Sequence, residues 1–281
     1  SEMCIRDRFA GGSISKDFAP HAVKAGAVVI DNSSAFRMDP DVPLVVPEVN
    51  PQAILKHKGI IANPNCSTII MVMALKPIYD LAKIKRVIVS TYQAVSGAGK
   101  EGIDELDAQV REHSEGREMT ANILPSASAE KHYPIAFNLI PQIDVFCDNL
   151  YTKEEMKMVN ETKKIMEDYE MRITATTIRV PVYRSHSESV NIELEKEVDL
   201  GAMREALAKF PGVTVQDDPS KQEYPMPLYT SEKDDVYVGR LRRDESCEKS
   251  YNMWVVGDQI RKGAALNTLQ IAETMIKNGW I

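Results

Sequence analysis

One cysteine of the chain has the surroundings of a nucleophile. Cys66 follows residues 59–63, which read as a buried strand, and precedes residues 68–82, which read as an apolar helix. A thiol at such a junction lies near unpaired backbone N–H groups and the positive end of the helix dipole. An isolated cysteine is more often an inert core residue. Because the neighbours in Asn63-Pro-Asn-Cys-Ser-Thr are polar, we predict instead a reactive thiol with a lowered pKa.

A thiolate mechanism also needs a group that carries protons, and His186 is the strongest candidate among five histidines. It lies in Arg184-Ser-His-Ser-Glu, a polar turn between two segments with strand character, where a side chain can point into a cleft. The other four histidines stand in polar or helical contexts typical of solvated side chains. Because imidazole titrates near neutral pH, we predict His186 as the general acid–base partner of Cys66.

An arginine within an apolar strand is a second unusual feature. Arg179 interrupts Ile178-Arg-Val-Pro, so its guanidinium is expected to be buried or to face a cleft, where it needs a carboxylate or phosphate partner. Ser96-Gly-Ala-Gly-Lys could cradle an anion before a helix, but Ala94 and Glu101 break the phosphate-loop pattern. An ordinary helix start explains that turn equally well.

The elements around these residues indicate an α/β fold in two parts. Residues 27–30, 44–46 and 59–63 read as short buried strands alternating with helical segments, the pattern of a parallel sheet with covering helices. After residue 100 the pattern changes, and strands with one solvated face are expected at 190–195, 236–241 and 253–256. A final helix at 263–278 could return to the first part.

Composition narrows the classes of function. The chain has 281 residues, 43% of them hydrophobic, and a net charge of −7 without a basic cluster, which argues against nucleic-acid binding. The longest apolar run has seven residues, far from the ~20 that span a bilayer. Four widely spaced cysteines form no zinc or redox motif and indicate a reducing, cytoplasmic compartment. We therefore expect a protein with neither a metal site nor a membrane span.

Several motifs in this order resemble those of the aspartate-β-semialdehyde dehydrogenase family. The likeness extends over residues 10–281. Its motifs are Pro47-Glu-Val-Asn, Asn-Pro-Asn-Cys66-Ser-Thr, Gln93-Ala-Val-Ser-Gly-Ala-Gly, Pro141-Gln-Ile-Asp-Val-Phe, Arg179-Val-Pro, His186-Ser-Glu, Trp254-Val-Val and Lys262-Gly-Ala-Ala.

The resemblance implies NADPH-dependent reduction of β-aspartyl phosphate to aspartate semialdehyde, with release of phosphate, in the pathway to lysine, threonine, methionine and diaminopimelate. Cys66 would form the thioester, His186 would act as acid–base, and Gln93 would orient the thioacyl intermediate. The implied binding residues are Arg179 for the substrate carboxylate, Glu154 for its amino group, Arg37 and Lys157 for phosphate, and Ser96, Gly97 and Gln259 for NADP.

The resemblance also implies a domain organisation. We expect a partial Rossmann-like NADP-binding domain from residues 1–66 and 258–281, and an α+β catalytic and dimerisation domain with a mixed sheet from residues 67–257. A homodimer or a dimer of dimers would result. Family members begin with a strand, a Gly-rich turn and a helix. No such pattern precedes Ala10, so we expect residues 1–9 to be unrelated sequence joined to a domain that lacks its first βαβ portion.

Three alternatives stay open. N-acetyl-glutamyl-phosphate reductase uses similar chemistry, but Asn65 before the cysteine and Ser67-Thr68 after it favour the aspartyl enzyme. The chain could instead be a non-catalytic dimerisation module that does not bind NADP. A thiol hydrolase built on Cys66 and His186 would leave Arg37 and Lys157 without a role.

Overall fold

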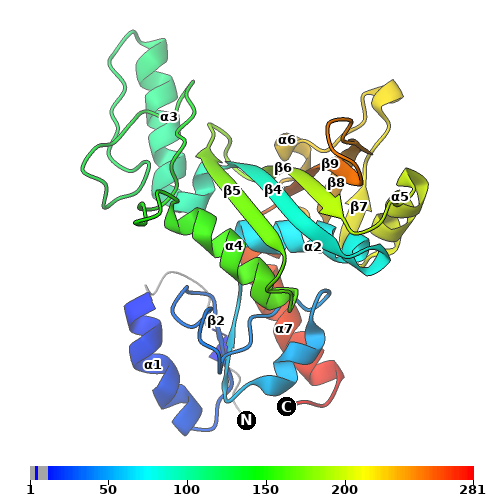
Figure 1. The fold of residues 1–281 in the computed structure, drawn as a ribbon. Coiled ribbons are helices and arrows are strands. Elements are labelled where there is room, and N and C mark those ends of the chain that lie inside the picture. Colours follow the sequence, from blue (N-terminus) through cyan, green and yellow to red (C-terminus); the bar gives the residue numbers. More distant parts are fainter. Residues whose placement is uncertain (1–3, 6–11) are drawn as a thin grey trace.

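The computed structural model describes residues 4–5 and 12–281. It divides into two α/β parts, each built on its own sheet. The smaller one is a parallel sheet in the order β1 (Cys4–Ile5), β2 (Val29–Asp31) and β3 (Ile60–Ala62). Helices α1 (Gly12–Lys24) and α7 (Leu266–Lys277) both contact β2, and they lie on either side of it in Figure 1. The expectation that residues 1–9 are unrelated sequence falls largely outside the described residues.

The larger sheet has six strands and mixed directions. Strand β4 pairs with β5 in parallel and with β6 antiparallel, while β9 pairs antiparallel with β6 and β8, and β7 adds in parallel to β8. The order is β5-β4-β6-β9-β8-β7. The bounds are Ile84–Gln93 (β4), Arg172–Arg179 (β5), His186–Leu194 (β6), Val213–Val215 (β7), Val236–Arg243 (β8) and Ser250–Gly257 (β9). The predicted fold class, a parallel sheet plus an α+β part with a mixed sheet, is confirmed.

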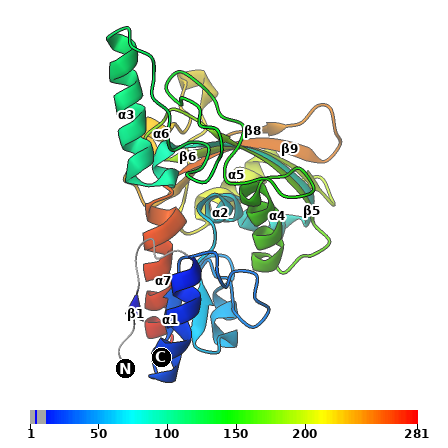
Figure 2. The ribbon, with the colours of Figure 1, turned by 90° about the vertical axis from the view of Figure 1, so that its left-hand side faces the viewer.

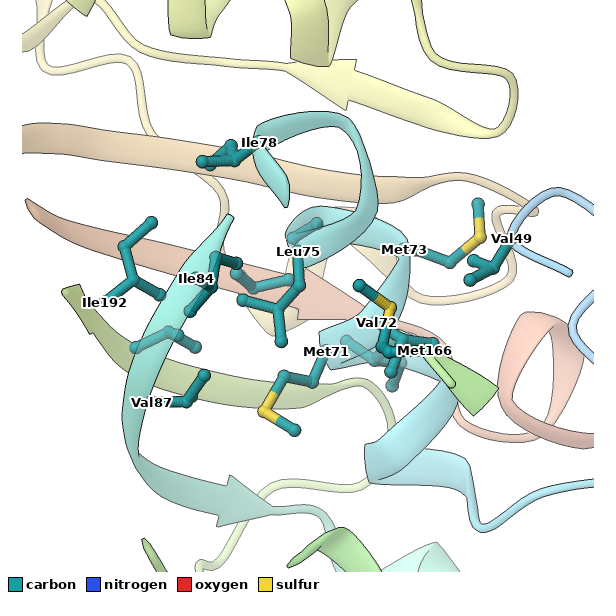
Figure 3. Close-up of a cluster of buried hydrophobic side chains, with 14 of the residues drawn as sticks. Val49, Met71, Val72, Met73, Leu75, Ile78, Ile84, Val87, Met166 and Ile192 are labelled. Carbon is teal, nitrogen blue, oxygen red and sulfur yellow. The ribbon is translucent and has the colours of Figure 1, made fainter. Parts of the chain in front are cut away.

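Helix α2 (Cys66–Leu81) lies between the two sheets in both views of the molecule (Figures 1 and 2). Its residues 67–75 are all buried and mostly apolar, as expected for a helix enclosed by other elements. Figure 3 shows Leu75 beside Ile84 of the large sheet, and Met73 beside Val49 from the first part of the chain. The helix that begins at the predicted nucleophile is therefore also the central core element.

The remaining helices surround these sheets. Helix α3 and the segment after it extend away from both sheets, with a small core of their own that includes Leu106 and Ile135. Among the described residues no helix is long and apolar enough to cross a membrane. The bounds are Lys100–Ser114 (α3), Lys153–Ile165 (α4), Leu200–Lys209 (α5), Pro227–Thr230 (α6), and short 3₁₀ helices at Pro51–Lys56, Val95–Ala98 and Pro219–Lys221.

Two local expectations differ from the structure. The strand predicted at residues 44–46 forms only a single bridge, from Leu44 to Ala62. Pro43 and Pro47 flank this segment and lack the N–H groups that a longer ladder needs. Helix α1 was not predicted, and it contains Pro20, a residue that disfavours helix.

Candidate active site

All ten residues predicted for the site line one cleft of about 860 Å³. Residues from the parallel sheet, from α2 and from the ends of the large sheet's strands meet there. The structure brings these residues together, and their individual roles stay predictions. The ten are Arg37, Cys66, Gln93, Ser96, Gly97, Glu154, Lys157, Arg179, His186 and Gln259.

Cys66 is the first residue of α2, directly after the strand β3 and its connecting loop. The side chain of Asn65 caps the helix by accepting a hydrogen bond from the Thr68 N–H at 3.2 Å. Gly263, in a π-helical turn (Arg261–Ala265) before α7, lies so close that a Cβ atom there would stand 2.9 Å from the Cys66 Cβ. The nucleophile is thus fixed between a helix cap and a close-packed glycine.

The expectation of a lowered thiol pKa is wrong for this site. Burial, and next the nearby charge of Glu154, raise the pKa of Cys66 to about 12. The charges of Arg37 and Arg179 oppose this rise only in part. The position at the helix start could be read from the sequence, but the facing carboxylate comes from α4, which is distant along the chain.

The charge of Glu154 therefore lowers the fraction of Cys66 that is ionised to thiolate. Removing that charge should raise this fraction. We expect Glu154→Gln to lower the Cys66 pKa and to raise its alkylation rate by iodoacetamide at neutral pH by roughly tenfold, because one pKa unit changes the thiolate fraction tenfold. Mass spectrometry of the alkylated peptides would follow Cys66, with Cys147 and Cys247 as internal references. Asp144→Asn is the matched control, since that carboxylate contacts Lys157 but does not shift Cys66. An unchanged or slower rate in Glu154→Gln contradicts this account.

His186 is fully buried at the start of β6, and one of its ring nitrogens is already committed. The Ala94 N–H donates to Nδ1 at 3.0 Å, so the neutral ring carries its proton on Nε2. Nε2 itself is buried and has no hydrogen-bond partner among the described residues. Burial, and next the Arg179 charge, hold the His186 pKa well below its ordinary value. The site thus presents a neutral imidazole with a free N–H donor.

Glu154 is the hub of the hydrogen bonds in the cleft. Its Oε1 accepts from Asn65 Nδ2 at 2.9 Å and from Gln93 Nε2 at 3.2 Å, and its Oε2 pairs with Lys157 Nζ at 3.2 Å. Burial alone would raise its pKa, but Lys157 and these two amide donors hold the pKa below its ordinary value. Glu154 therefore stays ionised. Lys157 also pairs with Asp144 at 3.0 Å.

Arg179 ends strand β5 and is buried without an ion-pair partner among the described residues. Its Nη1 donates to the Ala94 carbonyl at 2.7 Å, while its Nε has no partner. Burial lowers its pKa, and Glu154 opposes that change. A Cβ on Gly97 would stand 2.8 Å from Arg179 Nη1 and 3.2 Å from His186 Cε1, so the glycine lets the backbone cover both side chains. An unpaired guanidinium in a cleft is suited to bind a carboxylate.

The other end of the cleft lies at the carboxyl end of β2. Asp31 accepts hydrogen bonds there from Ser15 Oγ at 2.7 Å and Ser33 Oγ at 2.8 Å. Gln259 donates to the Ser96 hydroxyl and accepts from the Ser185 N–H at 3.0 Å, which joins the 3₁₀ turn at Val95–Ala98 to the end of β9. In parallel sheets of this type, dinucleotides bind in the crevice beyond the strands' carboxyl ends.

The sequence predicted no role for three residues that the structure places in contact with the predicted site residues. Asn65 and Gly263 stand inside motifs that were recognised, so the motifs carried the signal. Glu161 lies outside every motif and contacts both Arg37 and the Asn65 backbone. The feature of the sequence that could have identified Glu161 is its helical spacing. It follows Glu154 by seven residues and Lys157 by four, so the three side chains lie on the same face of α4.

Comparison with known proteins agrees with this fold and site. The family model "Semialdehyde dehydrogenase, dimerisation domain" matches residues 75–262, and "Semialdehyde dehydrogenase, NAD binding domain" matches residues 9–57. These matches define the class as a semialdehyde dehydrogenase.

Individual relatives narrow the class. Aspartate-semialdehyde dehydrogenase of Aquifex aeolicus is 57% identical over 274 residues, which cover 97% of this chain and 79% of that protein. The structure of aspartate semialdehyde dehydrogenase II from Vibrio cholerae complexed with ASA has a TM-score of 0.90 at 48% identity, with 96% and 78% of the two chains covered. The Candida albicans enzyme with NADP has a TM-score of 0.73 at 25% identity, covering 96% and 76%. The chain belongs to the aspartate-semialdehyde dehydrogenase family.

Proposed function

We propose that this chain reduces L-β-aspartyl phosphate to L-aspartate semialdehyde with NADPH, through a thioester on Cys66. The observation that carries the proposal is the set of charges around the thiol. Arg37, Lys157 and Arg179 supply three cations and Glu154 supplies one anion in a single cleft. The substrate carries the complementary set: an acyl phosphate, a carboxylate and an ammonium group.

The positions of these charges support specific roles. Arg179 has no carboxylate partner in the described part of the chain and binds the substrate carboxylate through parallel N–H donors. Glu154 stays ionised and accepts the substrate ammonium. Arg37 and Lys157 hold the phosphoryl group and stabilise the charge that develops on it as it leaves. Gln93, which donates to Glu154, orients the acyl group beside the thiol.

Substrate binding can itself activate the nucleophile. The charge of Glu154 contributes to the high pKa of Cys66 in the free site. When the substrate ammonium pairs with Glu154, the contribution of Glu154 to the Cys66 pKa is neutralised. The pKa then falls, and a larger fraction of Cys66 is thiolate. The Cys66 sulfur then bonds to the acyl carbon, the bond from that carbon to the phosphate oxygen breaks, and the phosphate departs as HPO₄²⁻ onto Arg37 and Lys157, carrying the proton that the thiol loses.

His186 acts as a hydrogen-bond donor in this scheme. Its Nδ1 is occupied by the Ala94 N–H, so its Nε2–H is left to donate to a substrate bound in the cleft that His186 lines. A donor at that position stabilises the oxyanion of each tetrahedral intermediate. The ring is held neutral by burial and by Arg179, and this allows it to keep that role across the physiological pH range.

NADPH is the proposed reductant, and the cleft offers it a fitting site. Ser96, Gly97 and Gln259 line the cleft beside His186, and the cleft continues to Asp31 at the carboxyl end of β2. When bound, the cofactor supplies the hydride that reduces the thioester. The preference for NADP over NAD is supported by the Candida albicans relative, whose structure contains NADP.

An assay in the oxidative direction tests the proposal. The purified chain should reduce NADP⁺ only when aspartate semialdehyde and inorganic phosphate are both present, and more slowly with NAD⁺. Activity with N-acetyl-glutamate semialdehyde in place of the aspartyl compound would favour the related reductase. Lack of NADPH binding in a titration would favour the non-catalytic module, and hydrolysis of thioesters without cofactor would favour a hydrolase.

We also propose the wider organisation expected from the sequence. The match to a dimerisation domain supports a homodimer, and a dimer of dimers is a further possibility to measure by light scattering. The return of α7 onto β2 supports a cofactor domain made of residues 1–66 and 258–281, with residues 67–257 as the catalytic domain. Free thiols at Cys66, Cys147 and Cys247 support a reducing, cytoplasmic location.

A further inference from the structure

We propose that Glu161 is a positioning residue that orients Arg37 and the backbone before Cys66 for reaction at the acyl phosphate. The inference rests on the proposed function, because it concerns the site of that phosphate. Glu161 touches none of the reacting groups assigned above. It acts through two neighbours that do line the cleft, Arg37 and Asn65.

One carboxylate joins the phosphate-binding arginine to the nucleophile loop. Glu161 Oε1 pairs with Arg37 Nη1 at 3.2 Å, and Glu161 Oε2 accepts the Asn65 backbone N–H at 2.6 Å. Asn65 directly precedes Cys66 and caps its helix. The arginine proposed to hold the phosphoryl group and the loop that carries the attacking thiol are thus tied to the same side chain.

The contacts of Arg37 leave part of its guanidinium for a ligand. Nη1 is held by Glu161 and Nη2 donates to the Asn32 carbonyl at 3.0 Å. These two partners fix the plane of the group. Nε is buried and has no partner among the described residues, so it and the remaining N–H hydrogens can bind an anion. A group whose orientation is fixed in advance loses less entropy when phosphate binds.

Burial makes these contacts strong and specific. Glu161 is 1% exposed and Arg37 is 8% exposed, so water does not replace either partner. Glu161 comes from α4, whereas Arg37 and Asn65 belong to the loops after β2 and β3. The contacts of Glu161 therefore hold Arg37 and Asn65, which lie on two different loops, against one helix. Neither loop could set the position of the phosphate site by itself.

The test uses phosphate protection of Cys66, which requires no cofactor. Iodoacetamide alkylates Cys66 in the presence of increasing inorganic phosphate, and the concentration that gives half-protection is measured for wild type, Glu161→Gln, Arg37→Lys and the double variant. Glu161→Gln keeps the side-chain volume but replaces one acceptor oxygen with a donor. We expect it to raise the half-protection concentration about tenfold, in line with loss of one charge-assisted hydrogen bond. In the Arg37→Lys background the same change should have an effect below about twofold.

Matched measurements separate positioning from simple damage to the fold. Glu167→Gln removes an exposed glutamate just after α4 that pairs with Lys56, and it should leave the half-protection concentration unchanged. The KM for phosphate in the oxidative assay should rise in Glu161→Gln while the KM for the aldehyde stays within about twofold of wild type, since Arg179 does not contact Glu161. If Glu161→Gln fails to fold, Glu161→Asp replaces it, because the shorter side chain cannot hold both partners.

Two results would overturn the inference. One is a half-protection concentration in the Glu161 variant that is unchanged or lower than in wild type. The other is an equal effect in the wild-type and Arg37→Lys backgrounds. Failure of the proposed function is distinguishable from both, because it would appear as a wild-type chain that does not oxidise the aldehyde.

Discussion

Cys66→Ala is expected to lower turnover by roughly 10⁴-fold or more, as removal of a covalent nucleophile does in other enzymes. Among the side chains that the structure describes, the cleft offers no second thiol for the thioester, because Cys147 and Cys247 do not line it. The measurement is the initial rate of NADP⁺ reduction with aspartate semialdehyde and phosphate. Alanine suits the site, since Gly263 already packs against the Cys66 Cβ, which alanine retains.

The other cysteines provide the controls. Cys147→Ala and Cys247→Ala should both keep the wild-type rate, because Cys247 is exposed and Cys147 lies in the segment before α4. Thermal unfolding of all three variants should stay close to wild type. A Cys66→Ala chain with comparable activity would exclude the thioester mechanism.

Arg179→Leu is expected to produce the second largest loss. Two charge-assisted hydrogen bonds to a carboxylate are worth about 1.5–3 kcal/mol each, so kcat/KM should fall by about 10²–10⁴-fold. Arg179→Lys should not restore it, because a lysine offers a point charge and cannot form the paired contact. Steady-state kinetics with varied aldehyde concentration would measure both.

The same substitution should raise the stability of the free protein. Arg179 is buried with its Nε unpartnered and without an ion pair among the described residues, which is a costly state for a cation. Leucine removes that cost, so the Tm of Arg179→Leu should equal or exceed that of wild type. A clear drop in Tm would mean that the guanidinium stabilises the folded protein. That result would contradict its assignment as the group that binds the substrate carboxylate.

Local signals predicted the fold well where each element has its own pattern. The strand–helix junction at Cys66 and the alternating strands of the large sheet are both visible in short stretches of sequence. Helix α1 is interrupted in sequence by Pro20, and prolines reduce residues 44–46 to one bridge. The structure of each of these two segments depends on how neighbouring segments pack against it. A short stretch of sequence does not contain that information.

For the site, motifs predicted which residues meet but not what they do to one another. The thiol pKa depends on Glu154, and the tautomer of His186 depends on the Ala94 N–H. These partners come from other elements, so their effect appears only after folding. Glu161 is the clearest case, since its two contacts link segments that are far apart in the sequence.

The contact between Gly263 and Cys66 has a consequence for synthesis of the chain. The nucleophile stands in the first quarter of the sequence, whereas the turn that packs against it lies shortly before the last helix. Lys262, in the same turn, is buried and bound to Glu48, Asn267 and Gln270. During translation Cys66 therefore lacks this contact until the turn at residue 263 has left the ribosome. A lower alkylation rate of Cys66 would thus report the docking of this turn in a nascent chain.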